Sequence, residues 1–226
     1  MADEAVITRG YFITFEGGEG TGKSTQIGLL ADALTATGIE VQKTREPGGS
    51  PGAEEIRDLL VRGEPGRWDP MTEILLLYAA RNDHYRRRIE PALAAGHWVL
   101  CDRFADSTLA YQGAGGGIEL ETIRSLHSLV LGRVWPDLTV LLDLDVETGL
   151  ERAGQREETT SEGGETRYER MGGAFHDRLR QGYLSLAADA PERFAVVDAS
   201  QSIAIVAGDV ADKVAGRFDL ILEPRS

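Results

Sequence analysis

A glycine-rich segment near the start of the chain has the residue types and spacing of a phosphate-binding loop. Residues 17–24 read GGEGTGKS and match the pattern G-x-x-x-x-G-K-[ST]. Glycines at this spacing let successive backbone N–H groups curl around a β-phosphate, while the dipole of the following helix favours negative charge. Lys23 is placed to reach the β- and γ-phosphate oxygens, and the Ser24 hydroxyl is placed to ligate Mg²⁺. The segment predicts a site for a magnesium–nucleoside triphosphate.

The sequence around this loop fits the prediction. The apolar run YFITFE directly precedes the loop, and a helical pattern over residues 25–37 follows it, which is the strand–loop–helix context that the motif requires. An unliganded glycine-rich turn is the alternative, and the full motif in this context disfavours it. The residues expected to bind the nucleotide are Gly17, Gly18, Glu19, Gly20, Thr21, Gly22, Lys23, Ser24 and Thr25.

Two large classes of nucleotide-binding protein do not fit the rest of the chain. A GTPase would carry N-K-x-D and D-x-x-G segments, but the single asparagine, Asn82, is followed by Asp83, and no aspartate has a glycine three places on. A transport ATPase of the cassette type would carry L-S-G-G-Q, which is absent. Polar residues outside the loop must therefore indicate which class of nucleotide-binding protein this is.

Charged side chains that suit phosphate stand at the ends of two further predicted strands. Arg45 follows a run over residues 40–44, and Asp102 and Arg103 stand at the end of a run over residues 98–102. Because ligands bind beyond the carboxyl ends of parallel strands, both arginines are expected near the phosphate-binding loop. Alternatives are a solvated loop arginine for Arg45, and a capping carboxylate with its ion-pair partner for Asp102 and Arg103.

The elements that must position these residues alternate along the chain. Short apolar runs over residues 11–16, 98–102, 139–143 and 194–198, with a weaker one over 40–44, predict strands. Residues 72–95 have helical spacing, which Pro91 is expected to kink or to split in two. This alternation predicts an α/β fold of the P-loop NTPase type, with a doubly wound, mostly parallel five-stranded sheet and helices on both faces.

The organisation predicted is a single domain over residues 1–226 with a short lid. Residues 153–166 read AGQREETTSEGGET, which is polar, contains glycine and lacks apolar periodicity. Arginines 152, 156 and 167 bracket this stretch. It is interpreted as a mobile loop, either a disordered surface insert or a lid at about residues 153–167.

Composition and charge limit the partners. The chain has 226 residues, enough for a core without metal or disulfide, and its net charge is −13, from 24 Lys and Arg against 37 Asp and Glu. This balance disfavours a general nucleic-acid-binding surface. The single cysteine, Cys101, excludes an internal disulfide, and neither a signal peptide nor an apolar run long enough for a membrane span is found. A cytosolic protein is expected.

Taken together, these segments resemble the thymidylate kinases, the nucleoside monophosphate kinases that make dTDP from dTMP. The resemblance covers nearly the whole chain, and it implies transfer of the ATP γ-phosphoryl group to dTMP with Mg²⁺. It also implies a homodimer that packs through the face including residues 72–88. The matching segments are FITFEGGEGTGKSTQ, TREPGG, EILLLYAAR, CDRFADSTLAYQG, WPDLTVLLDL, GLERAGQRE, GYLSLA and VVDASQS.

The resemblance implies roles at the phosphate end of the acceptor. Glu19 would face the 3′-hydroxyl of the acceptor sugar and organise the arginines. Arg45 and Arg103 would clamp the dTMP phosphate, while Asp102 would sit beside the metal ion that Ser24 ligates. The acceptor phosphate is a monoester with a second pKa of about 6, so it is already ionised at neutral pH and needs no general base.

The resemblance also implies which residues recognise the nucleoside. Arg81 would read thymine, with Ser107 and Thr108 on the polar edge of the base. Tyr111 would pack against the deoxyribose, and Gln112 would stand beside it. The alternatives are a helix-surface ion pair for Arg81 and ordinary helix packing for Tyr111 and Gln112.

Two features concern the subtype and the choice of substrate. One subtype has an arginine in the loop where this chain has Gly20, and the other supplies the charge from the lid. We expect Arg156 to be the lid catalytic arginine and Arg152 to lie nearer the adenine or the phosphates, with solvated charges as the alternative. Leu77 stands where the family usually has an aromatic that stacks on thymine.

Other functions stay open at this stage. Because Leu77 replaces the usual aromatic residue, a kinase of another nucleoside monophosphate or of a deoxynucleoside is an alternative function. A protein that uses ATP only to change shape is a further alternative, but it would not need a second phosphate site formed by Arg45 and Arg103. The lid also carries an acidic insertion, whose glutamates could hold the lid arginines away from phosphate until nucleotide binds.

Overall fold

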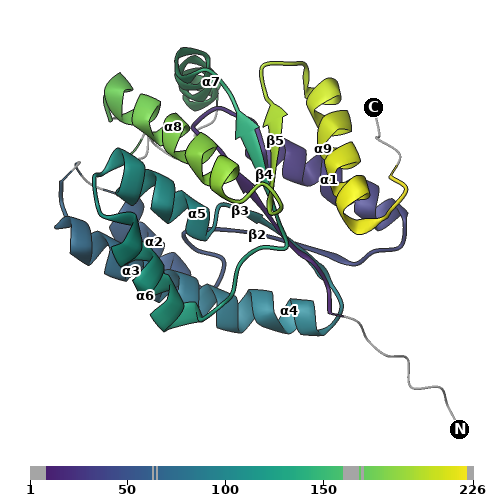
Figure 1. Cartoon of the computed structure of the whole chain (residues 1–226), viewed down its shortest axis with the longest axis horizontal. Coiled ribbons are helices and arrows are strands. Elements are labelled where there is room, and N and C mark those ends of the chain that lie inside the picture. Colours follow the sequence, from purple (N-terminus) through teal and green to yellow (C-terminus); the bar gives the residue numbers. More distant parts are fainter. Residues whose placement is uncertain (1–8, 63, 65, 160–167, 169–170, 223–226) are drawn as a thin grey trace, which may run out of the picture.

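The computed structural model describes residues 9–62, 64, 66–159, 168 and 171–222, and only the backbone of residues 156–159. In this part of the chain five parallel strands form one sheet in the order β2-β3-β1-β4-β5 (Figure 1). The strands are β1 Phe12–Glu16, β2 Val41–Arg45, β3 Trp98–Asp102, β4 Leu138–Asp143 and β5 Phe194–Asp198. The predicted strands and fold class are confirmed, with boundaries that shift by at most one residue.

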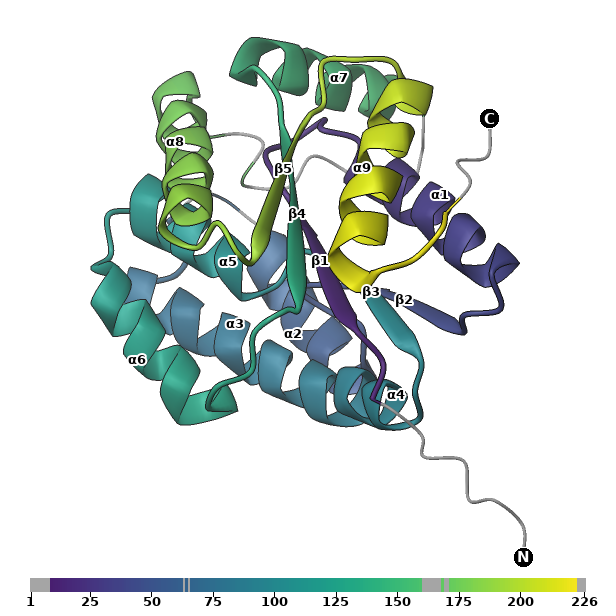
Figure 2. The ribbon, with the colours of Figure 1, turned by 45° about the vertical axis from the view of Figure 1, so that its right-hand side comes forward.

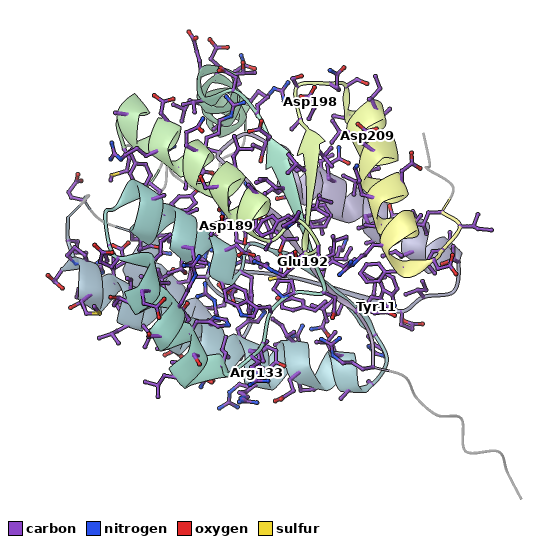
Figure 3. The ribbon with its side chains drawn as sticks, in the orientation of Figure 1. Tyr11, Arg133, Asp189, Glu192, Asp198 and Asp209 are labelled. Atoms are coloured by element: carbon purple, nitrogen blue, oxygen red, sulfur yellow. The ribbon has the colours of Figure 1, made fainter. Side chains whose placement is uncertain are left out.

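Helices cover both faces of the sheet, as expected for strands that are apolar throughout. Helices α1 and α9 lie on one side, and α3, α6 and α8 lie on the other (Figure 2). Side chains fill the space between sheet and helices, and Asp198 stands at the carboxyl end of β5 (Figure 3). The helices are α1 Lys23–Ala36, α2 Pro51–Val61, α3 Pro70–His84, α4 Glu90–Ala94, α5 Ala105–Thr108, α6 Leu120–Leu131, α7 Val146–Thr159, α8 Gly173–Asp189 and α9 Ile203–Phe218.

The core has two main parts, one on each side of the sheet. Apolar side chains of α1 and α9, such as Leu34 and Val210, pack on one face of the strands. On the other face, α3 and α8 pack together with the π-helix η2, Leu109–Gly115, and contribute Tyr78 and Leu179. None of the helices in the described residues is long and apolar enough to cross a membrane.

The helical stretch around Pro91 has no gap, so the predicted split in two is wrong. Between α3 and α4 lies a π-helix, η1, Tyr85–Ile89, and the N–H of Glu90 bonds to the carbonyl of Tyr85. Pro91 occupies the first turn of α4, where its missing N–H is least costly. The wider π turn thus lets the chain continue past the proline.

The polar stretch predicted as a loop begins as helix. Residues 153–159 continue α7, and residues 160–167 lie outside the described part. The loop prediction was wrong for residues 153–159 because the absence of apolar periodicity was taken as a sign of loop. Ala153, Gln155 and the following Arg and Glu residues are good helix formers, so intrinsic propensity favours a helix here without an apolar stripe.

A buried ion pair ties the loop after β3 to the central strands. Asp106 is fully buried and accepts two hydrogen bonds from Arg193, at 2.6 and 2.8 Å. The Thr139 hydroxyl in β4 donates to the same carboxylate at 3.1 Å and contacts the Thr14 hydroxyl of β1. Two-point pairing of this kind fixes geometry as well as charge, so Asp106 holds α5 against the sheet.

We expect Asp106→Ala to lower the free energy of unfolding by about 3 kcal/mol, because it leaves Arg193 without its buried partner. Urea denaturation followed by circular dichroism measures the loss. The matched control is Glu90→Ala, which breaks the exposed Arg86–Glu90 pair and should cost no more than about 0.5 kcal/mol. Equal losses for the two variants would contradict the role given to Asp106.

Candidate active site

A cavity of about 350 Å³ opens at the carboxyl ends of β1, β2 and β3. The register of the sheet places Arg45 opposite Asp102, and Phe15 of β1 opposite the same aspartate, so these strand ends are level. Predicted site residues from the whole chain meet here. Those that line the cavity are Glu19, Gly20, Thr21, Gly22, Lys23, Ser24, Thr25, Arg45, Leu77, Arg81, Asp102, Arg103, Ser107, Thr108, Tyr111, Gln112 and Arg152.

Three predicted residues are not among those lining this cavity. Gly17 and Gly18 line a smaller cavity, of about 30 Å³, together with residues of β4, α7 and α8. The side chain of Arg156 lies outside the described part of the structure, although the backbone of this residue belongs to α7.

The loop depends on glycine for close approaches as well as for its turns. Gly17 has φ +138°, and a Cβ there would lie 2.5 Å from the carbonyl oxygen of Leu142. Gly20 has φ +66°, and its Cβ would lie 2.0 Å from the carbonyl oxygen of Gly149 in α7. The loop is therefore packed between β4 and the first turns of α7, and it leads into the N-terminus of α1.

The Lys23 ammonium lies inside the loop. Its Nζ donates to the carbonyl oxygens of Gly18, at 2.7 Å, and Gly17, at 3.2 Å. Burial and the nearby Arg103 lower the pKa of Lys23 to about 8, while the carboxylates of Asp102, Glu19 and Glu16 oppose this shift. An anion bound in the loop would stabilise the protonated form of Lys23. The loop therefore holds a positive side chain where it would contact a phosphate group.

Ser24 and Asp102 supply adjacent oxygen atoms at the mouth of the loop. The Ser24 hydroxyl, in the first turn of α1, donates to Asp102 Oδ2 at 3.0 Å. A hydroxyl and a carboxylate are ligands that suit Mg²⁺, which also keeps waters and phosphate oxygens in its shell. The donor set thus fits the magnesium ion that the sequence predicted.

Arg103 is held in a fixed position between the loop and the helices behind it. Its φ of +68° lies in the left-handed region, which is unfavourable for a side chain with a Cβ. Nη2 pairs with Glu19 at 3.0 Å, and Nη1 donates to the carbonyl of Gly17 at 2.9 Å. An ion pair between Arg103 and Asp102 was the alternative for these two residues. The structure instead pairs Arg103 with Glu19, and Asp102 accepts a hydrogen bond from Ser24.

Glu19 stays ionised in this surrounding. Burial by itself raises the pKa of its carboxyl, but the charges of Arg103 and Lys23, with a hydrogen bond from Tyr111 at 2.6 Å, outweigh burial and lower the pKa to about 2. Tyr111 also places its ring under the Arg103 guanidinium, 4.9 Å from the centroid. Helix packing alone does not account for Tyr111, since its hydroxyl takes part in the charged cluster.

Glu16 and Tyr183 support Arg103 and Ser107 from behind, and the sequence prediction missed both. Glu16 ends β1 and accepts hydrogen bonds from the backbone of Phe104, from Ser107 and from Tyr183, at 2.6 to 2.9 Å. Burial, with a smaller contribution from Asp106, raises the pKa of Glu16 to about 7. A carboxylate at the end of an apolar strand was the available signal for Glu16.

Arg81 forms a buried ion pair, not the surface pair considered as its alternative. Its guanidinium is 2% exposed, and Nε donates to Glu46 Oε2 at 2.7 Å. Nη2 donates to the Thr108 hydroxyl and to the carbonyl of Phe104, both at 3.0 Å. Thr108 thus lies beside Arg81, whereas the Ser107 hydroxyl donates to Glu16. The sequence prediction missed Glu46, although it directly follows Arg45.

The cavity wall near Leu77 contains further polar and aromatic groups. Gln112 donates to Glu73 at 2.8 Å and to the Tyr168 hydroxyl at 3.2 Å. The Tyr168 ring meets the ring of Tyr111 edge-on, with centroids 5.3 Å apart. An aromatic side chain therefore lines the cavity even though position 77 is leucine.

The remaining arginines lie at the outer ends of the cavity. Arg45 is half exposed and pairs with Glu54 at 3.0 Å, so it is both a solvated residue and part of the cavity wall. Arg57 lies nearby and donates to the carbonyl of Pro47 at 2.6 Å. On the other side, Arg152 donates to the carbonyl of Ala199 at 3.0 Å, next to the end of β5.

The fold and the site define a P-loop protein with a triphosphate-binding loop and a second cationic region in one continuous cavity, which is the arrangement of a nucleotide-dependent phosphotransferase. The model of the thymidylate kinase family matches residues 15–210, and the chain belongs to this family.

Similar proteins and a similar structure agree with this assignment. The chain is 55% identical to a thymidylate kinase of Caulobacter vibrioides over 95% of this chain and all of that protein. It is 53% identical to one of Ruegeria pomeroyi over 91% of this chain and 94% of that protein. The crystal structure of thymidylate kinase from Ehrlichia chaffeensis superposes with a TM-score of 0.71 at 35% identity, covering 91% of this chain and 99% of the other.

We expect Gly20→Ala to raise the dissociation constant for magnesium–ATP about tenfold or more, because the added methyl group overlaps the Gly149 carbonyl and pushes the loop away from α7. Isothermal titration calorimetry measures this constant. The matched control is Gly28→Ala in α1, where an added Cβ meets nothing within 4 Å. Unchanged binding in the Gly20 variant would show that the close approach to α7 is not needed.

Proposed function

We propose that this chain transfers the γ-phosphoryl group of ATP to dTMP, giving dTDP and ADP. The observation that carries the proposal is the cavity that joins the phosphate-binding loop around Lys23 to the buried side chain of Arg81, and Arg103 lines the same cavity. A nucleotide-dependent switch has no use for the part of this cavity around Arg81. Membership of the thymidylate kinase family supports the same function.

At the donor side, the loop backbone and Lys23 bind the ATP phosphates, and Arg152 lies nearer the adenine or the phosphates. Ser24 and Asp102 would hold Mg²⁺, which neutralises charge on the transferred phosphoryl group. No residue has to act as general base, since the acceptor phosphate is ionised at neutral pH. The protein's part is to align the two nucleotides and to compensate negative charge.

At the acceptor side, Arg45 and Arg103 bind the dTMP phosphate, and Glu19 faces the 3′-hydroxyl while it holds Arg103. Arg81 and Thr108 face the polar edge of the thymine base. Ser107, Tyr111 and Gln112 complete the pocket for the base and the deoxyribose, and Leu77 makes an apolar contact with the base. We also propose that the enzyme is a cytoplasmic homodimer, for which exposed Met71 and Leu75 on α3 offer apolar surface.

The choice of acceptor is tested with a panel of substrates. With purified protein, ATP and Mg²⁺, we expect dTMP to give turnover of about 1 to 100 per second, the usual order for kinases. UMP, CMP, AMP and thymidine should give little ADP, and dUMP shows how far Leu77 relaxes the choice of base. Preference for another acceptor would remove the thymidine-binding roles from Arg81, Thr108 and Tyr111, whereas slow ADP release indifferent to every acceptor would favour a switch.

The proposed lid arginine is tested by substitution. We expect Arg156→Ala to lower kcat at least about a hundredfold and to leave dTMP affinity nearly intact, because its charge is needed only as the phosphoryl group transfers. Steady-state kinetics and dTMP titration separate the two effects. Arg124→Ala, on the exposed side of α6, is the control for loss of an arginine elsewhere. Near-normal turnover of the Arg156 variant would exclude its catalytic role.

A further inference from the structure

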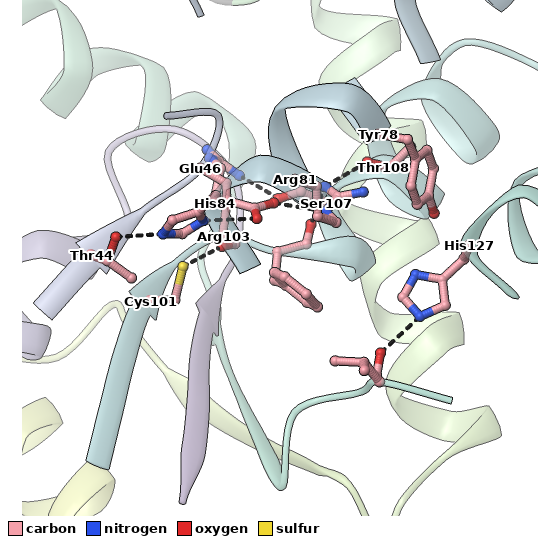
Figure 4. Close-up of polar contacts among 12 residues, drawn as sticks. Thr44, Glu46, Tyr78, Arg81, His84, Cys101, Arg103, Ser107, Thr108 and His127 are labelled. Atoms are coloured by element: carbon pink, nitrogen blue, oxygen red, sulfur yellow. Dashed lines mark hydrogen bonds and ion pairs between the residues drawn. The ribbon is translucent and has the colours of Figure 1, made fainter. Parts of the chain in front are cut away.

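One terminal nitrogen of the Arg103 guanidinium is anchored to the protein. Nη1 has two hydrogens, and the carbonyl of Gly17 accepts one of them at 2.9 Å. The other lies within reach of two hydroxyls, that of Tyr183 at 3.2 Å and that of Ser107 at 3.4 Å. Figure 4 shows Arg103 beside Ser107, just beyond the strand that carries Cys101. The second hydrogen of Nη1 thus depends on hydroxyl groups, of which Tyr183 provides the closer.

Nε and Nη2 form an edge of the guanidinium that two oxygens of a phosphate can bind side by side. Among the described residues, Nη2 donates to Glu19 alone, at 3.0 Å, and it has a second hydrogen. Nε donates to none of the described residues and is not one of the buried atoms left without a partner. The Arg103 side chain is 15% exposed and lines the main cavity. This edge is therefore open to a ligand in the cavity.

The carboxylate of Glu16 determines how the Tyr183 hydroxyl is turned. Tyr183 Oη donates to Glu16 Oε2 at 2.9 Å, and Ser107 donates to the same oxygen at 2.6 Å. Burial and the charge of Glu16 raise the pKa of the Tyr183 phenol well above its usual range, so the phenol keeps its hydrogen. Because a hydroxyl has a single hydrogen, Tyr183 then only accepts from Arg103.

Tyr183 belongs to a closely packed part of the fold. Its side chain is 1% exposed and lies in the same core cluster as Leu109 of η2. The neighbouring Gly182 packs so closely on η2 that a Cβ there would lie 2.4 Å from the Cβ of Ala114. Tyr183 does not line the main cavity, so it acts on a ligand there only through Arg103.

The anchor on Nη1 orders Arg103 without competing for the edge that a phosphate needs. Glu19 also holds Arg103, but it does so through Nη2, which is part of that edge. A side chain that is ordered before its ligand arrives loses less conformational entropy on binding, so it binds more tightly. The contact with Tyr183 therefore favours binding of a phosphate group.

We propose that Tyr183 is a positioning residue for the acceptor phosphate: its hydroxyl, oriented by Glu16, anchors Arg103 through Nη1 and leaves the edge formed by Nε and Nη2 for phosphate oxygens. The inference rests on the proposed function, in which Arg103 binds the phosphate of dTMP. Tyr183 touches neither nucleotide.

The test compares two ligands that differ by the phosphate, at about pH 8, where a Glu16 carboxyl with a pKa of about 7 is ionised. We expect Tyr183→Phe to raise the dissociation constant for dTMP about tenfold in calorimetry, because the ligand itself must then order Arg103. The constant for thymidine, which lacks the phosphate, should change less than about twofold. The KM for dTMP should rise with the dTMP constant, while kcat at saturating dTMP stays within about threefold, since the bound phosphate then holds the guanidinium.

A double-mutant cycle shows whether Tyr183 acts through Arg103. Arg103→Lys keeps a positive charge but lacks the planar fork that Tyr183 anchors. In the Arg103→Lys background we expect Tyr183→Phe to change the dTMP constant less than about twofold, whereas a general disturbance of the core would cost the same in both backgrounds. The control is Tyr85→Phe, a buried tyrosine in the core around Phe12 that does not line the cavity, and it should change none of these constants.

Three results would overturn the proposal: an unchanged dTMP constant in Tyr183→Phe, equal weakening of dTMP and thymidine, or the full loss in the Arg103→Lys background. Should Tyr183→Phe fail to fold, Ser107→Ala decides the question, because it removes the other hydroxyl that Nη1 reaches. Its loss for dTMP should exceed its loss for thymidine, and equal losses would count against the proposal. Failure of the wild-type protein to bind dTMP would instead contradict the proposed function.

Discussion

The structure depends on keeping several cations together at one buried place. Lys23, Arg81 and Arg103 all line one cavity. Lys23 and Arg81 are buried and the Arg103 side chain is 15% exposed, although like charges repel and burial penalises each of them. Each cation is stabilised by a carboxylate or by backbone carbonyls within hydrogen-bond distance. The carboxylates that surround them are Glu16, Glu19, Glu46 and Asp102. The cavity can therefore take two phosphorylated ligands without having to assemble its charges first.

The parallel sheet provides this arrangement because strand ends converge. Glu16, Arg45 and Asp102 end β1, β2 and β3, and the register keeps these ends level. Residues just beyond the strand ends then contact partners that are distant in the sequence. Glu46 contacts Arg81, and Arg103 contacts Glu19. The Asp106–Arg193 pair and the two threonines of β1 and β4 stabilise this edge from behind.

The sequence was sufficient for features that depend on neighbouring residues. The phosphate-binding loop, the strand runs and the residues at strand ends could be predicted because their chemistry and spacing are local. Partners distant along the chain could not be predicted: Glu16 meets Tyr183 from 167 positions away, and Glu46 meets His84 from 38. The helical part of the polar stretch was missed for a different reason, since residues 153–159 form a helix although they lack an apolar period.

The packing of α7 on the phosphate-binding loop explains why the loop itself lacks an arginine. Position 20 combines a positive φ with a Cβ direction that points at the Gly149 carbonyl, so no larger side chain fits there without moving the helix. Arginine side chains beside the loop then come from other elements, as Arg103 and Arg152 do. Helix α7 begins beside the loop and carries Arg152 on its cavity side. The same contact that excludes a side chain at position 20 thus brings α7 and its Arg152 to the cavity that contains the phosphate-binding loop.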